Sequence, residues 1–359
     1  MSDVARVKYV KLRAFVFDVF KGLGVPDDDA AVCADVLMAA DLKGFDSHGV
    51  NRLKPVYYDR VKAGIQSPLT RIEVVREGPT TAVVDGCNGM GMVVAKRCME
   101  MCIGKARELG MGMLAVRNST HYGIAGYYAE MAAEEGMIGI TGTNARPSVA
   151  PTFSVENMLG TNPFTFAFPT DEAFPFCLDC ATSITQRGKV EVYAREGKKL
   201  PEGLVIGADG AYMTDPGFIL AGLQKGDAAL LPLGGAGEET GGYKGYGYST
   251  VVEVLSASLQ TGKYLKALTG VNLGHFFIAV DVSAFTELDE FERTTGDILR
   301  SLRAARRAPG VERIYTAGEK EYYTSLERRE KGVPVSREVR AELLQMRDEL
   351  GLRHRFLFE

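Results

Sequence analysis

The chain has 359 residues and a formal net charge of −4, and 46% of its residues are hydrophobic and 25% are charged. This composition is typical of a globular protein of about two domains, and the near balance of charges excludes the basic surplus that nucleic-acid binding needs. The first residues contain no apolar block ahead of a cleavage site, and no run of about 20 apolar residues occurs. We therefore expect a cytoplasmic protein without a membrane-spanning segment.

Helices are predicted near both ends of the chain. The first covers residues 4–22, and the second begins after Pro26 with three aspartates and ends at Gly44. The third follows Ser47, a good N-cap residue, and reaches about Ala63. Three more helices are predicted at residues 288–306, 319–331 and 336–350. The helical segments of the two ends therefore bracket a central region.

The central region alternates between strands and helices. Strands are predicted at residues 70–75, 80–84, 112–116, 138–143 and 275–282. Helices are predicted at residues 93–109 and 125–135, and after the glycine-rich residues 234–247 as far as about 259, while residues 147–179 are expected to form strands and ordered loops. We predict an α+β fold: a helical domain of residues 1–74 and 306–359, and a central sheet domain of residues 75–305.

Two common sequence signals do not apply here. Gly110, Gly112 and Ala115 match the string G-x-G-x-x-A, but they follow a helix and enter a strand, the reverse of a Rossmann loop, and no P-loop motif occurs.

Six cysteines are too few for a disulfide scaffold, and the pairs Cys98/Cys102 and Cys177/Cys180 are about 75 residues apart, too far for a compact zinc site. We expect small buried thiols and no metal.

Residues 46–52 are the richest local group of polar residues. If Ser47 caps the third helix, His48 and Arg52 lie four residues apart on one face of its first turns. The helix N-terminus and the guanidinium both favour a neutral imidazole. The pair suits a 2-oxo or 2-hydroxy acid, whose carboxylate Arg52 holds while His48 exchanges a proton with the neighbouring oxygen. A surface histidine beside a solvated arginine is the alternative.

Three other segments carry candidate site residues. Residues 117–123 end a strand and contain His121, for which a helix-capping role is the alternative. Residues 179–183 follow a strand-like run. Residues 241–247 open a helix where Lys244 adds a charge suited to phosphate, with a simple flexible turn as the alternative. His275 and His354 are expected to be structural or surface residues.

Seven ordered segments resemble the type-2 malate/L-lactate dehydrogenases, a family of NAD(P)-dependent oxidoreductases without a Rossmann fold. They are DSHGVNRL (46–53), NSTHYGIAGYY (118–128), LGTNPFTFAFPT (159–170), DCATS (179–183), GGYKGYG (241–247), GHFFIAVD (274–281) and YTAGEKEY (315–322). The resemblance covers essentially the whole chain. It implies a homodimer whose cofactor domain is built on a largely antiparallel sheet, beside a helical domain formed by both chain ends.

The resemblance also implies roles for single residues. The acid/base of the family matches either His48 or His121, and we favour His48 because Arg52 lies beside it. Segments that contact NAD or NADP match Asp179, Cys180, Ala181, Thr182 and Ser183, Lys244 with Gly245, Gly318 with Glu319, and Asn144 as a weaker candidate. The substrate is expected to contact Ser47, Arg52, and the loop of Thr161, Asn162 and Pro163.

The insert at residues 187–203 and the tail at residues 330–352 look most like the malate dehydrogenase branch of the family. Malate/oxaloacetate is therefore the first choice of substrate, and Arg146, Arg187 and Lys189 are candidates to bind its second carboxylate. Lactate, sulfolactate, ureidoglycolate and cyclic imino acids are alternatives within the family. A protein that binds a nicotinamide nucleotide or a 2-oxo acid without turnover is the alternative from another class, and the intact histidines count against it.

Overall fold

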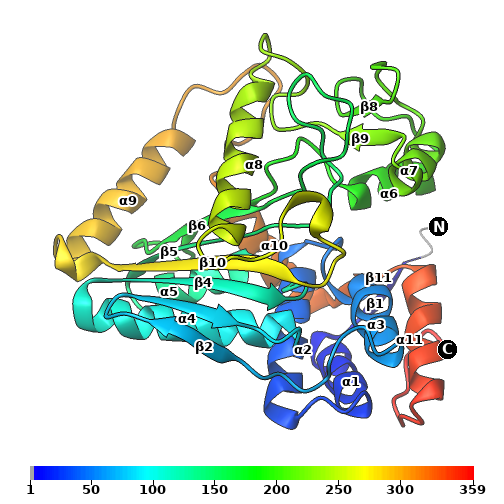
Figure 1. The fold of residues 1–359 in the computed structure, drawn as a ribbon, viewed down its shortest axis with the longest axis horizontal. Coiled ribbons are helices and arrows are strands. Elements are labelled where there is room, and N and C mark those ends of the chain that lie inside the picture. The colour runs from blue at the N-terminus through cyan, green and yellow to red at the C-terminus, as the bar shows by residue number, and fades with distance from the viewer. Residues whose placement is uncertain (1–3) are drawn as a thin grey trace.

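A seven-stranded sheet forms the centre of the computed structural model, which describes residues 4–359 (Figure 1). The strand order is β2-β3-β4-β10-β5-β6-β7, and every neighbouring pair is antiparallel except β3 and β4. The strands are β2 (Glu73–Glu77), β3 (Thr81–Asp85), β4 (Met111–Ser119), β5 (Met137–Thr143), β6 (Phe164–Phe168), β7 (Phe176–Cys180) and β10 (Leu273–Asp281). The predicted fold class, an α+β fold on a largely antiparallel sheet, is confirmed.

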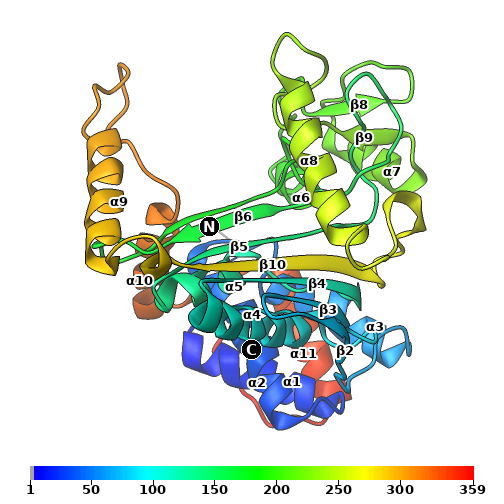
Figure 2. The same ribbon diagram turned by 60° about the vertical axis from the view of Figure 1, so that its left-hand side comes forward.

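Helices cover the two faces of this sheet unequally (Figure 2). One face packs against α4 (Gly91–Leu109) and α5 (Gly126–Glu134), and the other carries α8 (Gly242–Ala257) and α9 (Leu288–Arg303) on opposite sides. Glycines in the strands allow the close packing of α4 and α5. A Cβ at Gly112 would lie 2.4 Å from the Cys102 carbonyl oxygen, and one at Gly139 would lie 2.1 Å from that of Ala129.

Segments from the two chain ends pack together in a helical unit below the sheet (Figure 1). β1 pairs antiparallel with β11, and α10 packs against α2. The elements are β1 (Ala5–Val7), α1 (Tyr9–Gly22), α2 (Asp27–Lys43), α10 (Glu319–Lys331), β11 (Val333–Val335) and α11 (Arg337–Glu349). The residue boundaries given above for the two domains stay a prediction. In residues 4–359 no helix has both the length and the apolar character to cross a bilayer.

A small lobe, residues 183–233, extends beside α8 (Figure 1). It contains α6 (Arg187–Arg195), β8 (Val205–Gly207), α7 (Pro216–Lys225) and β9 (Ala228–Leu230), and short 3-10 turns η3 (Leu265–Ala267) and η4 (Val282–Ala284) occur elsewhere. The lobe has its own apolar core, built from Val190, Leu200, Val205, Ile219, Ala228 and Leu230, and Val149 and Leu159 from an earlier loop complete it. The sequence analysis identified no elements in this lobe.

Most predicted elements are confirmed, but two predicted helices are wrong in part. Residues 5–7 form β1, so the first helix begins at Tyr9. The helix predicted from Ser47 to Ala63 is instead a 3-10 turn, η1 (Val50–Arg52), a π-helix, η2 (Leu53–Tyr58), and a short α3 (Asp59–Lys62). Pro55 lies inside η2, where it has no N–H for a regular helical hydrogen bond. Rejecting a Rossmann loop at Gly110 was correct, since this glycine ends α4 with a φ of 84° and β4 follows.

Candidate active site

One end of the central sheet collects most of the predicted site segments. β4 and β5 are both antiparallel to β10, so they run in the same direction and end just before His121 and Asn144. β6 starts at this end, directly after residues 161–163, and β7 finishes there within residues 179–183. The strand order therefore brings together loops that are far apart in the sequence.

The two candidate histidines lie side by side. Their ring centroids are 5.9 Å apart and their ring planes differ by 20°. His48 comes from the turn between α2 and η1, and His121 comes from the loop between β4 and α5. The structure thus brings together the two residues that the resemblance left as alternatives for the acid/base.

His48 lies ahead of the first helical residue, Val50, so its predicted place on the first turn of a helix is wrong. Ser47 does not cap a helix; its hydroxyl oxygen lies 2.7 Å from His48 Nδ1. Burial, followed by the charge of Arg52, lowers the pKa of His48 to about 4. The ring is therefore neutral at pH 7, as predicted, but desolvation rather than a helix dipole is the main cause.

The turn that carries His48 is held in place by Asp41, a buried residue of α2. Its carboxylate accepts the backbone N–H of Val50 at 2.9 Å. A Cβ at Gly49 would lie only 1.9 Å from Asp41 Oδ1, so this close approach requires glycine. Burial raises the pKa of Asp41 to about 7. The sequence analysis missed Asp41, because an aspartate near the end of a helix carries no distinguishing signal.

Arg52 keeps much of its hydrogen-bonding capacity free. Its Nε donates to the carbonyl oxygen of Ser47 at 2.6 Å, and it forms no ion pair with any carboxylate of residues 4–359. The first turn of α6 lies against this group, since a Cβ at Gly188 would be 3.5 Å from Arg52 Nη2. The outer N–H groups of Arg52 are therefore free to hold a carboxylate beside the two histidines.

His121 has two partners at the same ring nitrogen. The backbone N–H of Gly123 donates to Nδ1 at 3.2 Å, and the hydroxyl of Tyr57 lies 2.6 Å from it. Burial is the main cause of a His121 pKa well below the usual value, and the nearby charges of Arg52 and Arg60 act in the same direction. Tyr57 was missed by the sequence analysis, since a buried aromatic residue at helical spacing normally indicates only a core position.

The side chains of residues 179–183 contact the chain's own loops. The half-buried Asp179 accepts the backbone N–H of Gly126, at the start of α5, at 2.7 Å, and the hydroxyl of Thr165 at 3.1 Å. Thr182 donates to the carbonyl oxygens of residues 161 and 162, and the Ser183 hydroxyl donates to that of residue 185. Cys180 and Ala181 are half-buried. Contact of this segment with a cofactor stays a prediction.

The glycines around Lys244 serve close packing within the chain. A Cβ at Gly245 would lie 2.3 Å from the Leu233 carbonyl oxygen, and one at Gly242 would lie 1.9 Å from that of Gly235. Because these two glycines have no side chain, the first turn of α8 packs closely against residues 233 and 235, where the small lobe ends. Lys244 itself is exposed in that turn and forms no ion pair with the carboxylates of the described chain.

Four other predicted ligand residues are engaged in structural contacts. The Asn162 amide accepts the N–H of residue 145 and donates to Glu253, and the Asn144 amide joins the carbonyl of Lys263 to the N–H of residue 274. Gly318, at a φ of 89°, starts α10, and the buried Glu319 pairs with an arginine at position 313. Thr161 and Pro163, the neighbours of Asn162, are half-buried. Ligand contacts of all these residues stay predictions.

The other two histidines have structural partners. His275, buried in β10, lies 2.7 Å from the Thr143 hydroxyl and stacks on Tyr122 with ring centroids 4.5 Å apart. His354 Nε2 lies 2.6 Å from an Asp18 carboxylate oxygen. Both residues thus have the structural or surface roles expected from the sequence.

Comparison with known proteins identifies the family. The family model for malate/L-lactate dehydrogenase matches residues 7–344. The chain belongs to this family. It is 46% identical to malate dehydrogenase from Pyrococcus horikoshii over 356 residues, or 98% of this chain and 97% of that protein. It is 39% identical to L-sulfolactate dehydrogenase from Methanocaldococcus jannaschii over 346 residues, or 95% and 96% of the two chains.

A solved structure of this malate/L-lactate dehydrogenase family supports the architecture. The crystal structure of malate dehydrogenase from Entamoeba histolytica matches with a TM-score of 0.96 at 44% identity, and the match covers 98% of this chain and 100% of that one. The resemblance carried by the seven segments is therefore confirmed. The chain is an oxidoreductase of a family of hydroxy-acid dehydrogenases.

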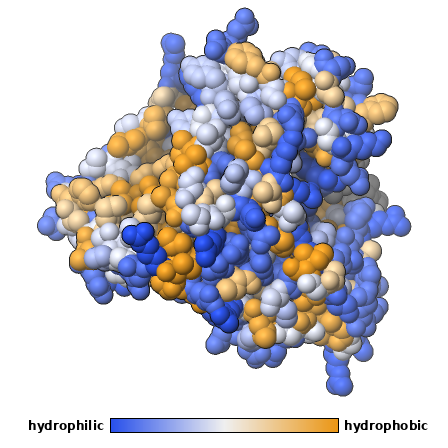
Figure 3. Space-filling model, viewed as in Figure 1, coloured by the Kyte–Doolittle hydropathy of each residue, from blue (hydrophilic) through white to orange (hydrophobic). Residues whose placement is uncertain are grey.

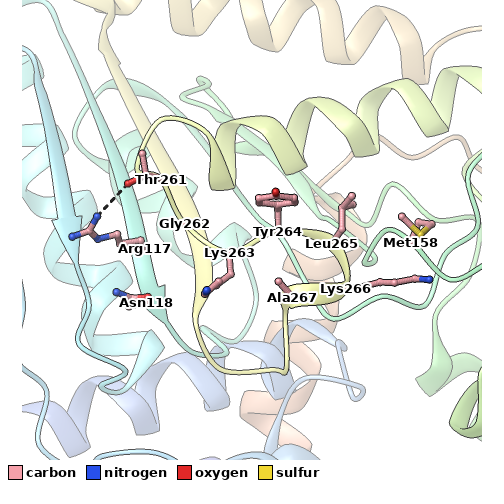
Figure 4. A pocket seen from close by; sticks show the side chains of 10 residues that line it. All are labelled: Arg117, Asn118, Met158, Thr261, Gly262, Lys263, Tyr264, Leu265, Lys266 and Ala267. Carbon is pink, nitrogen blue, oxygen red and sulfur yellow. Dashed lines mark hydrogen bonds between the residues drawn. The ribbon is translucent and has the colours of Figure 1, made fainter.

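A cavity of about 540 Å³ opens at the same end of the sheet in this member of the family (Figure 4). It lies between the end of β4 and the loop that joins α8 to β10, and its lining includes Arg117, Lys263 and Tyr264. The Asn144 amide holds this loop through the Lys263 carbonyl oxygen. Arg117 and Asn118 belong to the predicted site segment 117–123, but none of the residues to which a catalytic or ligand-binding role was assigned lines the cavity.

Proposed function

We propose that the protein oxidises malate to oxaloacetate, and reduces oxaloacetate to malate in the reverse direction, with NAD or NADP as the cofactor. The observation that carries this proposal is the pair His48 and His121 beside the guanidinium of Arg52, which forms no ion pair within residues 4–359. The identity to malate dehydrogenases over nearly the whole chain supports malate as the substrate.

His48 exchanges the proton of the substrate hydroxyl. Its neutral ring at pH 7 has no protein partner at Nε2 within residues 4–359, so this nitrogen is free to take the hydroxyl proton during oxidation. The imidazolium then returns the proton in the reverse reaction. Arg52 holds the C1 carboxylate with two parallel hydrogen bonds and so orients C2. A bound nicotinamide cofactor supplies the hydride acceptor for C2.

The first turn of α8 fits the phosphates of such a cofactor. The exposed Lys244 stands at the N-terminus of a 16-residue helix, where free backbone N–H groups favour an anion. We assign the remaining contacts to Asp179, Cys180, Ala181, Thr182 and Ser183, to Gly245, to Gly318 with Glu319, and to Asn144, and the substrate contacts to Ser47, Thr161, Asn162 and Pro163. The tight packing of Gly245 against Leu233 fixes where Lys244 stands.

The second carboxylate of malate needs another cation. Among the three candidates, Arg187 pairs with Glu191, whereas Arg146 is exposed and close enough to Arg60 to affect its pKa. Lys189 is exposed in the first turn of α6. Arg146 is our first choice because it lies near Arg60, whose charge acts on His121.

A spectrophotometric panel tests the reaction. NADH and NADPH are each combined with oxaloacetate, pyruvate, 3-sulfopyruvate and a cyclic imino acid, and the loss of cofactor absorbance is followed. We expect the fastest rate with oxaloacetate. A faster rate with 3-sulfopyruvate would assign the sulfolactate reaction, which the 39% identical relative supports. Cofactor binding with no rate on any compound would contradict the proposal and favour a binding protein.

The protein acts as a cytoplasmic homodimer in this proposal. All six cysteines are free thiols, as is usual in a reducing compartment. Apolar side chains stand exposed on α9, where Ile298 and Leu302 are 56% and 55% accessible, and on α8 at Val251 and Val254; Figure 3 shows apolar residues gathered between these helices. Sedimentation at twice 38.9 kDa is expected, and a monomer at micromolar concentration would contradict it.

A further inference from the structure

Tyr57 lies behind the candidate active site in the π-helix η2. Its side chain is fully buried, and its hydroxyl ends 2.6 Å from His121 Nδ1, with the two rings edge to face at 5.8 Å. The next residue, Tyr58, is also buried but sends its hydroxyl to Glu349 instead. Single π-turns in helices often occur at functional sites. Of the two adjacent tyrosines, therefore, only Tyr57 contacts a histidine of the candidate active site.

The contacts of His121 Nδ1 determine where its proton is held. A backbone N–H can only donate, so the 3.2 Å contact from Gly123 requires a lone pair on Nδ1. In the neutral ring the proton is then on Nε2. If His121 were protonated to the imidazolium, its Nδ1–H would point at the N–H of Gly123, and the two donors would repel each other. Positive or titratable groups also surround the ring and disfavour a second proton: His48, Arg52, Arg60 and His275.

His48 is different because, within residues 4–359, its Nδ1 faces a hydroxyl alone, without the backbone N–H that also faces Nδ1 of His121. The Ser47 hydroxyl can donate to Nδ1 in one state and accept Nδ1–H in the other. His48 can therefore pass between neutral and protonated forms without losing this hydrogen bond, whereas His121 cannot. The two histidines, 5.9 Å apart, are thus suited to different tasks.

The geometry points to Tyr57 as the positioning residue that, with the Gly123 N–H, holds His121 as the neutral Nε2–H tautomer. His121 then donates a hydrogen bond to the substrate oxygen at C2, while His48 exchanges the proton. This assignment of roles rests on the proposed dehydrogenase function, but the tautomer itself does not. Within residues 4–359, Nε2 of His121 has no protein partner, which leaves its N–H for a ligand.

The tautomer is measured directly by ¹⁵N NMR of histidine-labelled protein. The chain has only four histidines, so the His121 signals can be assigned by comparison with His121→Gln. We expect an acceptor nitrogen at δ1 and a protonated nitrogen at ε2, with no imidazolium at neutral pH because the pKa of His121 is lowered. Tyr57→Phe leaves the weaker contact from the Gly123 N–H as the remaining donor to Nδ1, so a share of the Nδ1–H tautomer should appear beside the Nε2–H form. Tyr58→Phe, the matched control, should give the wild-type spectrum. A proton on Nδ1 in the wild type would overturn the proposal.

Kinetics form the second arm of the test. Tyr57→Phe should lower kcat by about 10- to 100-fold, with cofactor Kd and thermal stability near those of Tyr58→Phe. An unchanged kcat together with mixed tautomers would overturn the role of the Nε2–H tautomer in turnover. If the wild type turns over no substrate but shows the Nε2–H tautomer, the proposed function fails while the positioning by Tyr57 stands.

Discussion

The two sides of the candidate active site use their polar groups differently. On the side of the helical unit, His48 and Arg52 keep groups free for a ligand. On the side of the sheet, Asp179, Asn144 and Asn162 direct their carboxylate and amide groups to the chain's own backbone and side chains. In the proposed function the first set acts on the substrate, whereas these contacts of the second set hold the loops around the site in position. Substitutions on the two sides should therefore change different quantities.

The largest effect is expected for His48→Ala, on the ligand side. Removing the acid/base should lower kcat by about 10³-fold, because proton exchange with the substrate hydroxyl is lost. Cofactor Kd, measured by fluorescence titration, and Tm should remain close to wild type. Turnover within a few-fold of wild type would show that the proton goes to another group, for which His121 is the first candidate.

Arg52→Lys should have a smaller effect of a different kind. A lysine keeps the charge but cannot form the two parallel hydrogen bonds to a carboxylate, so KM for the 2-oxo acid should rise about 30-fold. The effect on kcat should be smaller than the effect on KM. Steady-state kinetics at saturating cofactor measure both, and an unaltered KM would exclude Arg52 as the carboxylate ligand.

On the structural side, Asp179→Ala should reduce stability. It removes the acceptor for the Gly126 N–H at the start of α5 and the partner of Thr165, at a cost of about 2 kcal/mol in the free energy of unfolding. Asp179→Asn is the matched control, because its amide oxygen can still accept from Gly126 while its NH₂ donates to the Thr165 hydroxyl. Denaturant unfolding and cofactor titration separate the two roles. A large loss of cofactor affinity in Asp179→Asn, with stability intact, would show that the carboxylate itself contacts the cofactor, whereas a Kd near that of the wild type would limit Asp179 to its structural role.

Sequence patterns predicted the elements that have their own local signals. The first-turn aspartates and Gly44 set the limits of α2, and Ser336 caps α11 by accepting the N–H of Val339, as helix-start rules imply. Within residues 47–63, Pro55 is a local signal for the interrupted helix that was overlooked. The first turn could not be predicted, because the close contact of Gly49 with Asp41 replaces it. That contact depends on packing between separate elements, which no local pattern records.

The site was predicted at the level of segments rather than of single roles. Most motif residues meet at one end of the sheet, since strand order decides this and the motifs lie next to the strands. Gly318 is an exception, because it lies against Pro175 and Cys177 at the start of β7, whereas β7 finishes at the site end. Which of them bind a ligand could not be read from the motifs. Asp179 and Asn162 have the same polar groups as a ligand-binding residue, and only their contacts with Gly126 and Glu253 show what those groups hold. No feature of the sequence distinguished Tyr57 from an aromatic residue of the core.

The smallest expected change is in the pH dependence of malate oxidation. It tests how Arg52 affects His48, the two residues that keep groups free for a ligand. Burial and Arg52 lower the pKa of His48 to about 4, so the base form is already complete well below neutral pH. kcat/KM for malate oxidation, which reports the free enzyme, should therefore stay level from about pH 8 to 6 and fall only near pH 5 or below. The same lowered pKa makes the unfolded state bind more protons as pH falls through about 6.5, so folding stability decreases there and must be followed by circular dichroism. Arg52→Gln should move the acid limb toward higher pH because a charge that lowers the pKa is lost, whereas a wild-type limb centred near pH 6.5 would mean that His48 is solvated in the working enzyme.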